Sequence, residues 1–407
     1  MGKFIINGSA QLSGRVDISG SKNAALPLIF AAITTRGKSV FHNVPNISDV
    51  EIALELISSL GAEVFRCGDD LIIKTSDLKY KRPDDFLVAK IRASSYLLGA
   101  DLARFGICHL QSFGGCNFDN RPVDMHIYAM TALGAQKNGD SFVADELFGS
   151  DVFFGKISVG ATVNALILAA SAKGKTRIFG YAKEPHVIAL IDFLRSAGAT
   201  ISVFDDRVEV IGAELHGAEA TVIPDMIEAG TYAALSLLTN SKIEICGAEP
   251  LHLDSFLKVI LSSGASYSFT SNDLLILHGT PNNHFDVVTQ AYPGYPTDLQ
   301  PQLTPIMARF CGGSITENVW VGRFGYLGEL EKFGVRYTIS KNCAYIYKSR
   351  LHCAEATAPD LRGGAALLMC ALACEGKSVV DSSEIIKRGY SDVIKKLRIL
   401  GADIEEI

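Results

Sequence analysis

The amino-acid sequence predicts an α/β protein of two domains, in which repeated units place sheets on the outside and small-residue helices on the inside. Two observations indicate this class. The chain has 407 residues, which exceeds what one ordinary hydrophobic core holds and favours two domains. A short phrase at helix ends also returns six times along the chain, and such self-similarity is typical of a fold built by repetition.

The repeated phrase joins the end of an amphipathic helix to the start of a strand. Its central residue is glycine, which is preferred in the left-handed position after a helix. Successive glycines lie 64 to 73 residues apart. They are Gly61, Gly134, Gly198, Gly264, Gly334 and Gly401. Strand-like runs lie at residues 207–211, 274–277 and 344–348, so we expect six βαβ-containing units, three in each domain.

Each repeat also holds an earlier helix that is rich in Ala, Gly, Ser and Leu on nearly all faces. A helix that is apolar all round is buried, and small side chains let its neighbours approach closely. These helices are expected to begin near residues 21–23, 91–94, 158–160, 225–228, 296–298 and 359–362.

The first turns of these buried helices carry residues suited to chemistry. They are Lys22, Asn23, Arg92, Asp225, Glu228, Asp298, Asp360 and Arg362, and the start at Ser158 follows Lys156. Helix capping accounts for Asp225 and Asp360. It does not account for Lys22 and Arg92, because a cation at the positive end of a helix dipole costs stability. If the two domains face each other, these helix starts line the cleft between them and favour an anionic ligand.

Composition and charge exclude several classes of function. The chain is 48% hydrophobic and 20% charged, and its net charge of -6 opposes non-specific binding to nucleic acid or to an anionic membrane. The N-terminal residues lack an export signal, and the longest apolar runs, such as 24–33, fall short of a bilayer span. We therefore expect no nucleic-acid partner and no membrane insertion.

Cysteine and motif usage point to a reduced, cytoplasmic protein. The nine cysteines form an odd set without a CxxC pair, which fits neither a disulfide framework nor a zinc knot. The histidines show no metal-binding spacing, and no helix opens on a GxGxxG or Walker pattern. We expect no metal and no cofactor, so that a nucleotide is bound as a substrate.

One loop sets a thiol beside a guanidinium. Gly114 and Gly115 precede Cys116 and let the backbone bend and move. Pro122 favours an extended Arg121, which can then point outward. An exposed cysteine beside an arginine has a lowered pKa and is a usable acid, base or nucleophile near neutral pH. The alternative is a surface turn that holds a structural cysteine.

Nine motifs, in order along nearly the whole chain, resemble those of the UDP-N-acetylglucosamine 1-carboxyvinyltransferase family and, more distantly, of EPSP synthase. They lie at residues 18–27, 92–94, 114–126, 156–162, 224–231, 296–298, 323–324, 360–362 and 388–390. The resemblance implies a two-domain inside-out α/β barrel of six βαβαββ units, in agreement with the repeat. It places residues 22–224, with the Cys116 loop, in one domain and residues 1–21 and 225–407 in the other, with the active site in the cleft between the domains.

The resemblance also implies a reaction. The family transfers the enolpyruvyl group of phosphoenolpyruvate to the 3′-hydroxyl of UDP-N-acetylglucosamine and releases phosphate, which begins bacterial peptidoglycan synthesis. The reaction runs by addition and elimination through a tetrahedral intermediate. It needs a proton for the methylene carbon, a base for the sugar hydroxyl, and cations for phosphate and carboxylate.

By the same resemblance, these roles fall on particular residues. Cys116 is the acid that protonates the methylene carbon, and it is the thiol that the epoxide fosfomycin is expected to alkylate. Asp298 matches the base, with a helix N-cap as the alternative role. The expected phosphate-binding cations are Lys22, Arg121 and Arg388, and the candidates for the carboxylate are Arg323 and Arg362.

The remaining matches concern the nucleotide sugar, which is expected to contact the first turns of several helices. Tyr96 lies one helical turn beyond Arg92 and is expected to pack on the ligand, and Trp320 is expected to line the cleft. The residues expected to bind are Asn23, Arg92, Arg121, Pro122, Val123, Asp124, Met125, Lys156, Ser158, Val159, Gly160, Val319 and Asp360.

Three positions depart from the family's usual residues. His186, Met226 and Gly363 stand where glutamate, arginine and alanine are usual. They leave open a paralogue with weaker catalysis or altered domain closure. Two other hypotheses also stay open: an enolpyruvyl transferase that acts on another nucleotide or sugar, and a catalytically silent homologue that binds nucleotide sugars. The sequence does not predict the oligomeric state.

Overall fold

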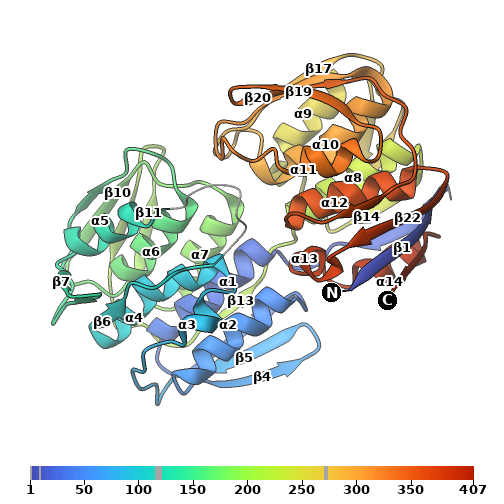
Figure 1. The fold of residues 1–407 in the computed structure, drawn as a ribbon. Coiled ribbons are helices and arrows are strands. Elements are labelled where there is room, and N and C mark those ends of the chain that lie inside the picture. Colours follow the sequence, from blue (N-terminus) through green and yellow to red (C-terminus); the bar gives the residue numbers. More distant parts are fainter. Residues whose placement is uncertain (1, 9–10, 115–121, 270–273) are drawn as a thin grey trace. The chain divides into compact units, whose positions relative to one another are not determined.

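The computed structural model describes residues 2–8, 11–114, 122–269 and 274–407, with the backbone alone for 274–278. The chain forms two compact units, which are described separately (Figure 1). The first, called the 20–223 unit, begins at Gly20 and ends at Ile223. The second, called the 224–407 unit, combines residues from Pro224 to Ile407 with the N-terminal residues up to Ser19.

The 20–223 unit places three sheets around small-residue helices, within the residues described. The sheets have the strand orders β13-β3-β5-β4, β6-β8-β7 and β11-β12-β10-β9. The strands are β3 (Lys38–His42), β4 (Glu63–Cys67), β5 (Asp70–Lys74), β6 (Ile107–His109), β7 (Gln136–Asn138), β8 (Ser141–Val143), β9 (Asp151–Phe153), β10 (Lys175–Phe179), β11 (Thr200–Val203), β12 (Arg207–Ile211) and β13 (Glu219–Thr221). The helices are α1 (Lys22–Ala31), η1 (Ala32–Thr34), α2 (Ser48–Ser59), α3 (Asp85–Val88), η2 (Arg92–Tyr96), α4 (Leu97–Phe105), α5 (Asp124–Ala132), α6 (Val159–Ala169) and α7 (Pro185–Ser196).

The 224–407 unit repeats this plan with the sheets β15-β16-β14-β2, β17-β18-β20-β19 and β21-β22-β1-β23. Its strands are β1 (Lys3–Gly8), β2 (Ser13–Asp17), β14 (Lys242–Cys246), β15 (Ser266–Phe269), β16 (Leu274–His278), β17 (Phe285–Val288), β18 (Gly313–Thr316), β19 (Arg336–Ser340), β20 (Cys343–Tyr347), β21 (Glu355–Thr357), β22 (Gly376–Asp381) and β23 (Asp403–Glu406). Its helices are α8 (Met226–Thr239), η3 (Pro250–Leu253), α9 (Asp254–Ser262), η4 (Thr297–Leu299), α10 (Gln300–Ile306), η5 (Met307–Cys311), α11 (Tyr326–Glu331), α12 (Leu361–Ala373), α13 (Ser383–Lys387) and α14 (Val393–Ile399).

The first strands of the chain complete sheets that the last third of the chain begins. β1 pairs with β22 on one side and with β23 on the other, in both cases antiparallel. β2 pairs in parallel with β14. In Figure 1 the N-terminal strand β1 accordingly lies beside β22, although almost the whole sequence separates them. The N-terminal residues therefore belong structurally to the 224–407 unit.

The helix ends predicted from the repeat are confirmed. All six glycines of the phrase have a positive φ, between 88° and 118°. They follow α2, α5, α7, α9, α11 and α14, and a strand begins within two residues of each. Only glycine adopts this backbone conformation without strain, so the glycines end the helices where the sequence predicts.

The six buried helices also begin where the sequence predicts, and α1, α4, α6, α8, α10 and α12 fill the two cores. Two of them start with a tight 3₁₀ turn, η2 before α4 and η4 before α10. Asp225 caps α8 by accepting from Ile227 N and Glu228 N at 2.7 and 3.1 Å. In the described ranges, no helix has both the length and the hydropathy needed to cross a bilayer.

Candidate active site

Lys22 is the first residue of α1 and meets a buried carboxylate. Its Nζ atom lies 3.3 Å from Oδ2 of Asp49, on α2, and the Asp49 side chain is only 4% exposed. Sequence reasoning missed Asp49, because a single aspartate near a helix start reads as an ordinary capping residue. The pair holds a cation in place at the positive end of the α1 dipole, where sequence reasoning expects an anion to bind.

Arg92 and Tyr96 lie at the two ends of η2. Burial lowers the pKa of Arg92, and it raises the pKa of Tyr96 to about 12. The Tyr96 ring packs edge-on against Phe30 of α1, with 6.2 Å between ring centroids. Tyr96 thus contributes to the contact between α1 and η2 and remains partly exposed.

The starts of α5 and α6 lie against each other. Asp124 opens α5 and is exposed, as are Pro122 and Lys156. Ser158 caps α6, and its hydroxyl accepts from Ala161 N at 3.3 Å. Val123, Met125, Val159 and Gly160 are partly buried. Since α6 contacts η2 as well as α5, and η2 contacts α1, these helix starts form one neighbourhood within the 20–223 unit.

In the 224–407 unit, Asp298 is held by two arginines. Arg323 donates from Nη1 to Oδ1 at 2.6 Å, and Arg362 donates from Nε to Oδ2 at 3.3 Å. The Asp298 side chain is 29% exposed, whereas the arginine side chains are 4% and 1% exposed. The carboxylate pairs with guanidiniums, and the N-cap residues of η4 and α10 are Pro296 and Leu299, so the alternative of an N-cap aspartate is wrong.

Arg362 has guanidinium hydrogen-bond donors that Asp298 does not use. Its Nη1 and Nη2 atoms are buried and make no hydrogen bond among the residues described. Burial opposes its charge, but Tyr390, Asp298 and Asp225 outweigh burial and raise the pKa of Arg362 above its ordinary value. Buried polar groups are nearly always hydrogen-bonded. The two unpaired terminal nitrogens of a charged guanidinium therefore mark a place for an anionic ligand.

Asp360 and Tyr390 fix the position of Arg362. Asp360 caps α12 by accepting from Arg362 N at 2.9 Å and from Gly363 N at 3.0 Å. The guanidinium carbon lies 5.3 Å from the centre of the Tyr390 ring, close enough for a cation–π contact. The Tyr390 hydroxyl in turn bonds Thr231 at 2.9 Å and Gln302 at 3.2 Å.

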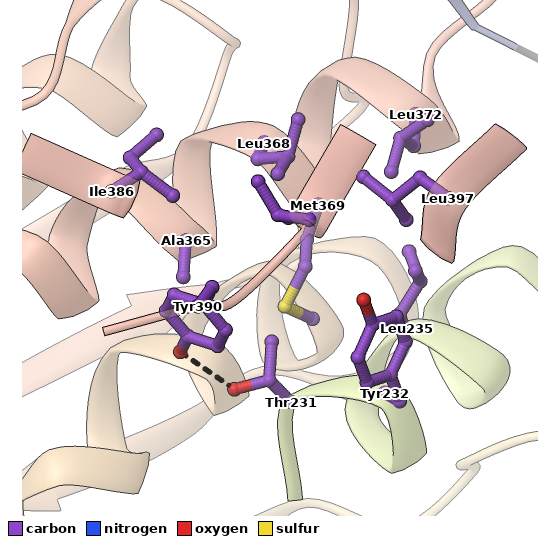
Figure 2. Close-up of a pocket in the computed structure, with 11 residues that line it drawn as sticks. Thr231, Tyr232, Leu235, Ala365, Leu368, Met369, Leu372, Ile386, Tyr390 and Leu397 are labelled. Carbon is purple, nitrogen blue, oxygen red and sulfur yellow. Dashed lines mark hydrogen bonds between the residues drawn. The ribbon is translucent and has the colours of Figure 1, made fainter. Parts of the chain in front are cut away.

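A small cavity of about 20 Å³ lies behind Tyr390. Figure 2 shows the hydrogen bond between Tyr390 and Thr231, with Leu368 and Met369 among the apolar side chains around the cavity. A volume of this size holds about one water molecule. The cavity is therefore no substrate site.

A buried glutamate that sequence reasoning missed organises the loop beside Asp298. Glu317 is fully buried. Its Oε1 accepts from the backbone N–H groups of Val319 and Trp320 at 2.8 and 2.9 Å, and its Oε2 accepts from Thr297 at 2.8 Å. Glu317 thereby ties the loop at Val319 and Trp320 to the residue that precedes Asp298. Its contacts with Val319 and Trp320 are local, but its contact with Thr297 spans 20 residues, and no sequence pattern indicates that contact.

The other expected residues are placed as follows. Arg388 is the C-cap residue that follows α13, and it is partly buried, two residues before Tyr390. Asn23 follows Lys22 on α1 and is partly buried. Cys116 and Arg121 lie outside the described residues. Within the part of the chain that the structure describes, no group of three or more His, Cys, Asp or Glu residues has the arrangement of a metal site.

Of the three departures, Gly363 has a structural reason. A Cβ atom at this position would lie 2.6 Å from Cβ of Tyr326, so the buried tyrosine excludes alanine. His186 is buried on α7, and Met226 is partly buried against the core of the 224–407 unit. Nothing in the structure explains these two substitutions.

Comparison with known proteins identifies the family. The family model for EPSP synthase (3-phosphoshikimate 1-carboxyvinyltransferase) matches residues 6–397. A protein of Caldanaerobacter subterraneus named UDP-N-acetylglucosamine 1-carboxyvinyltransferase 3 is 37% identical over the full length of both chains. A Listeria monocytogenes protein named UDP-N-acetylglucosamine 1-carboxyvinyltransferase 2 is also 37% identical, over 99% of this chain and 97% of its own.

Solved structures agree on the fold. The enolpyruvyl transferase NikO from Streptomyces tendae superposes with a TM-score of 0.88 at 24% identity, over 100% of this chain and 98% of its own. An EPSP synthase from Acinetobacter baumannii superposes with a TM-score of 0.74 at 15% identity, over the full length of both chains. The predicted inside-out α/β fold is thus confirmed.

The chain belongs to the EPSP synthase family of enolpyruvyl transferases. It is an enzyme of the class that transfers the enolpyruvyl group from phosphoenolpyruvate.

Proposed function

We propose that this enzyme transfers the enolpyruvyl group of phosphoenolpyruvate to the 3′-hydroxyl of UDP-N-acetylglucosamine and releases phosphate, the first committed step of peptidoglycan synthesis. The choice of UDP-N-acetylglucosamine as the acceptor rests on the relatives named UDP-N-acetylglucosamine 1-carboxyvinyltransferase, which are 37% identical over essentially the whole chain. The retained residues 122–125 and 156–160, at the starts of α5 and α6, support it.

Asp298 is the base for the sugar hydroxyl in this proposal. Its two oxygens are engaged by Arg323 and Arg362, and Arg362 keeps two further buried donors without partners among the described residues. The carboxylate of phosphoenolpyruvate suits these guanidiniums, because they recognise planar anions. When the substrate anion takes up the arginine donors, an Asp298 oxygen becomes available to accept the hydroxyl proton.

The remaining roles follow the resemblance. Cys116 delivers the proton to the methylene carbon, and Lys22, Arg121 and Arg388 hold the phosphate. The nucleotide sugar contacts Asn23, Arg92, the starts of α5 and α6, and the loop at Val319. Together the two units then supply the acid, the base and the cations that addition and elimination need.

Phosphate release from phosphoenolpyruvate, measured with a panel of nucleotide sugars, tests the proposal. UDP-N-acetylglucosamine is expected to give the highest kcat/KM. Preference for another nucleotide or sugar would identify a sister enolpyruvyl transferase. Binding of UDP-N-acetylglucosamine without phosphate release would identify a catalytically silent homologue. Intact-mass detection of a fosfomycin adduct at Cys116, with UDP-N-acetylglucosamine present, tests the thiol separately.

Asp298→Asn tests the base. The amide keeps the size of the side chain but cannot accept the hydroxyl proton, so kcat is expected to fall by roughly 10²–10⁴. Binding of UDP-N-acetylglucosamine, measured by calorimetry, should remain. Asp254→Asn is the control, because Asp254 is an exposed carboxylate paired with Lys258 on the surface of the same unit, and it should leave kcat unchanged. An unchanged kcat in Asp298→Asn would remove Asp298 as the base.

A further inference from the structure

A buried amide holds a buried histidine in the 20–223 unit. His126, on α5, and Asn164, on α6, are 4% and 0% exposed. The Asn164 Nδ2 atom lies 2.6 Å from His126 Nδ1. The same amide bonds two backbone groups of the neighbouring segment, Gly99 N at 2.7 Å and Ser95 O at 3.0 Å.

The two backbone groups settle which end of the amide faces which partner. The Gly99 N–H can only donate, so it faces Oδ1 of Asn164, and the Ser95 carbonyl can only accept, so it faces Nδ2. The second hydrogen of Nδ2 is then left for His126 Nδ1. Nδ1 therefore accepts and carries no proton. A neutral imidazole with an accepting Nδ1 carries its proton on Nε2.

Gly99 allows the close approach of its own backbone N–H to the Asn164 amide. A Cβ atom at position 99 would lie 2.4 Å from Oδ1 of Asn164 and 3.0 Å from its carbonyl oxygen. Any larger residue would push the amide away, so glycine lets α4 approach α6 closely enough for the Gly99 N–H to reach it. The amide therefore cannot turn over without breaking two backbone hydrogen bonds.

The far side of the ring meets the start of α6. The position of a Cβ atom on Gly160 lies 3.1 Å from both Nε2 and Cε1 of His126. Nε2 makes no hydrogen bond to the residues described here. The charged groups around the ring are Arg92 of η2 and Asp124 of α5. Burial, with Arg92 adding to it and Asp124 opposing it, lowers the pKa of His126 to about 4.

We propose that Asn164 is a positioning residue that fixes the ring and the tautomer of His126, so that Nε2 offers an N–H donor beside the first turn of α6. This donor lies near the Arg92 side chain and near the backbone N–H groups of the first turn of α6, which have no partner within the helix. Resting on the proposed function, we assign it to the phosphate oxygens of the nucleotide sugar. Because His126 stays neutral, it donates one hydrogen bond at the pH where the enzyme works.

The tautomer can be measured without any ligand. In the full-length protein labelled with ¹⁵N-histidine, long-range ¹H–¹⁵N correlation separates a protonated from an unprotonated ring nitrogen. His126 is assigned from the signal that is missing in His126→Gln. The expected result is a neutral ring protonated at Nε2 from about pH 6 to about pH 8.5. A ring protonated at Nδ1, or one that titrates in this range, would overturn the proposal.

Asn164→Asp converts the donor into an acceptor at nearly constant volume. The carboxylate still accepts from Gly99 N, but it now demands a proton on His126 Nδ1. An adjacent negative charge also favours the imidazolium. At about pH 6 the ring is then doubly protonated and Nε2 still donates, whereas at about pH 8.5 the neutral ring presents a lone pair at Nε2.

Binding of UDP-N-acetylglucosamine by this variant should therefore depend on pH. The ratio of its dissociation constant to that of the wild type is expected to be roughly ten- to hundredfold larger at about pH 8.5 than at about pH 6. This is the effect of losing one hydrogen bond to a charged group. A change of the same size at both pH values would mean a merely structural role and would overturn the proposal.

Thr162→Val is the matched control. Thr162 is fully buried on the same helix, and its hydroxyl accepts from Ala182 N at 2.9 Å, so the variant loses a buried hydrogen bond without touching His126. It should destabilise the protein and leave the pH dependence of binding as in the wild type. If the wild-type protein does not bind UDP-N-acetylglucosamine, the proposed function fails, and the tautomer measurement still decides the role of Asn164.

Discussion

Tyr232 and Tyr326 are buried tyrosines of the 224–407 unit, and they differ in what their hydroxyl groups meet. The Tyr326 hydroxyl bonds Thr304 at 2.9 Å and Gln300 Oε1 at 2.6 Å. Tyr232 lines the small cavity, and its hydroxyl has no hydrogen-bond partner among the residues described. A buried polar group without a partner costs free energy, whereas a bonded one is roughly neutral or stabilising.

Tyr232→Phe should therefore raise the free energy of unfolding or leave it unchanged, with a gain of up to about 1 kcal/mol. Tyr326→Phe removes a satisfied hydroxyl and leaves Gln300 Oε1 without its donor, so it should cost about 1–3 kcal/mol. Urea unfolding of the two variants and the wild type measures the difference. Equal losses in both variants would show that the two hydroxyls have equivalent surroundings.

Among the elements, the outer sheet of strands β13, β3 and β5 carries a histidine between two carboxylates. The Nδ1 atom of His42, on β3, lies 2.8 Å from Oδ1 of Asp70, on β5. Its Nε2 atom lies 2.8 Å from Oε1 of Glu219, on β13. Its hydrogen bonds to Asp70 and then Glu219 raise the pKa of His42. The protonated ring therefore links three neighbouring strands.

This pair of contacts predicts a pH-dependent contribution to stability. Because the folded-state pKa is raised, the contribution is fully present below the unfolded-state pKa of about 6.5 and is lost as the pH rises through the folded-state value. The loss of urea midpoint caused by His42→Gln should be larger at about pH 6 than at about pH 9. Glu219→Gln, which keeps one carboxylate, should weaken this pH dependence. Identical losses at both pH values would show that His42 acts only by packing.

The elements themselves were predictable from local signals. Glycine after a helix and small residues all round a helix are local properties, so the positions of α2 or α6 follow from short stretches of sequence. Two helix starts became 3₁₀ turns, at η2 and η4, a detail that composition does not determine. The motif residues of the candidate site could likewise be found, because they stand at those helix starts.

Their partners could not be predicted, because they are chosen by tertiary contacts. Asn164 reaches Gly99 65 residues away, and Arg362 reaches Asp298 64 residues away. Asp49 meets Lys22 27 residues away, and Glu317 meets Thr297 20 residues away. No pattern of period two or 3.6 encodes which side chain a buried group will meet. Residue roles were thus accessible where a motif carries them and inaccessible where only the fold does.

For the molecule as a whole, the way in which the chain is divided between the two units determines which parts can fold alone. The described residues between Gly20 and Ile223 supply every strand of the three described sheets of the 20–223 unit. The 224–407 unit needs the N-terminal residues, because β22 and β23 are joined only through β1 in their sheet. The chain ends also meet: Lys3 N donates to Ile407 O at 2.9 Å.

A chain of residues 20–223 should fold alone, whereas a chain of residues 224–407 should not. Adding residues 1–19 after Ile407 through a short glycine linker should restore folding, because the two ends are adjacent. Dispersed amide signals in NMR spectra and cooperative thermal unfolding measure each case. A stably folded 224–407 chain without β1 would contradict the view that this strand is essential to its sheet.

The pairing of β1 with β22 and β23 also sets a schedule for biosynthesis. Phe4 and Ile6 are fully buried in the finished protein, yet they are made long before their strand partners, which are Val380 and Ser378 on β22 and Glu406 and Ile404 on β23. At about 5–20 residues per second, translation of the intervening chain takes roughly 20–80 s. During that interval the 20–223 unit can reach its native state, while the apolar residues of β1 have no strand to pair with. Folding of the 224–407 unit therefore waits for the synthesis of β22 and β23, and until then the apolar residues of β1 are the segment that a chaperone would protect.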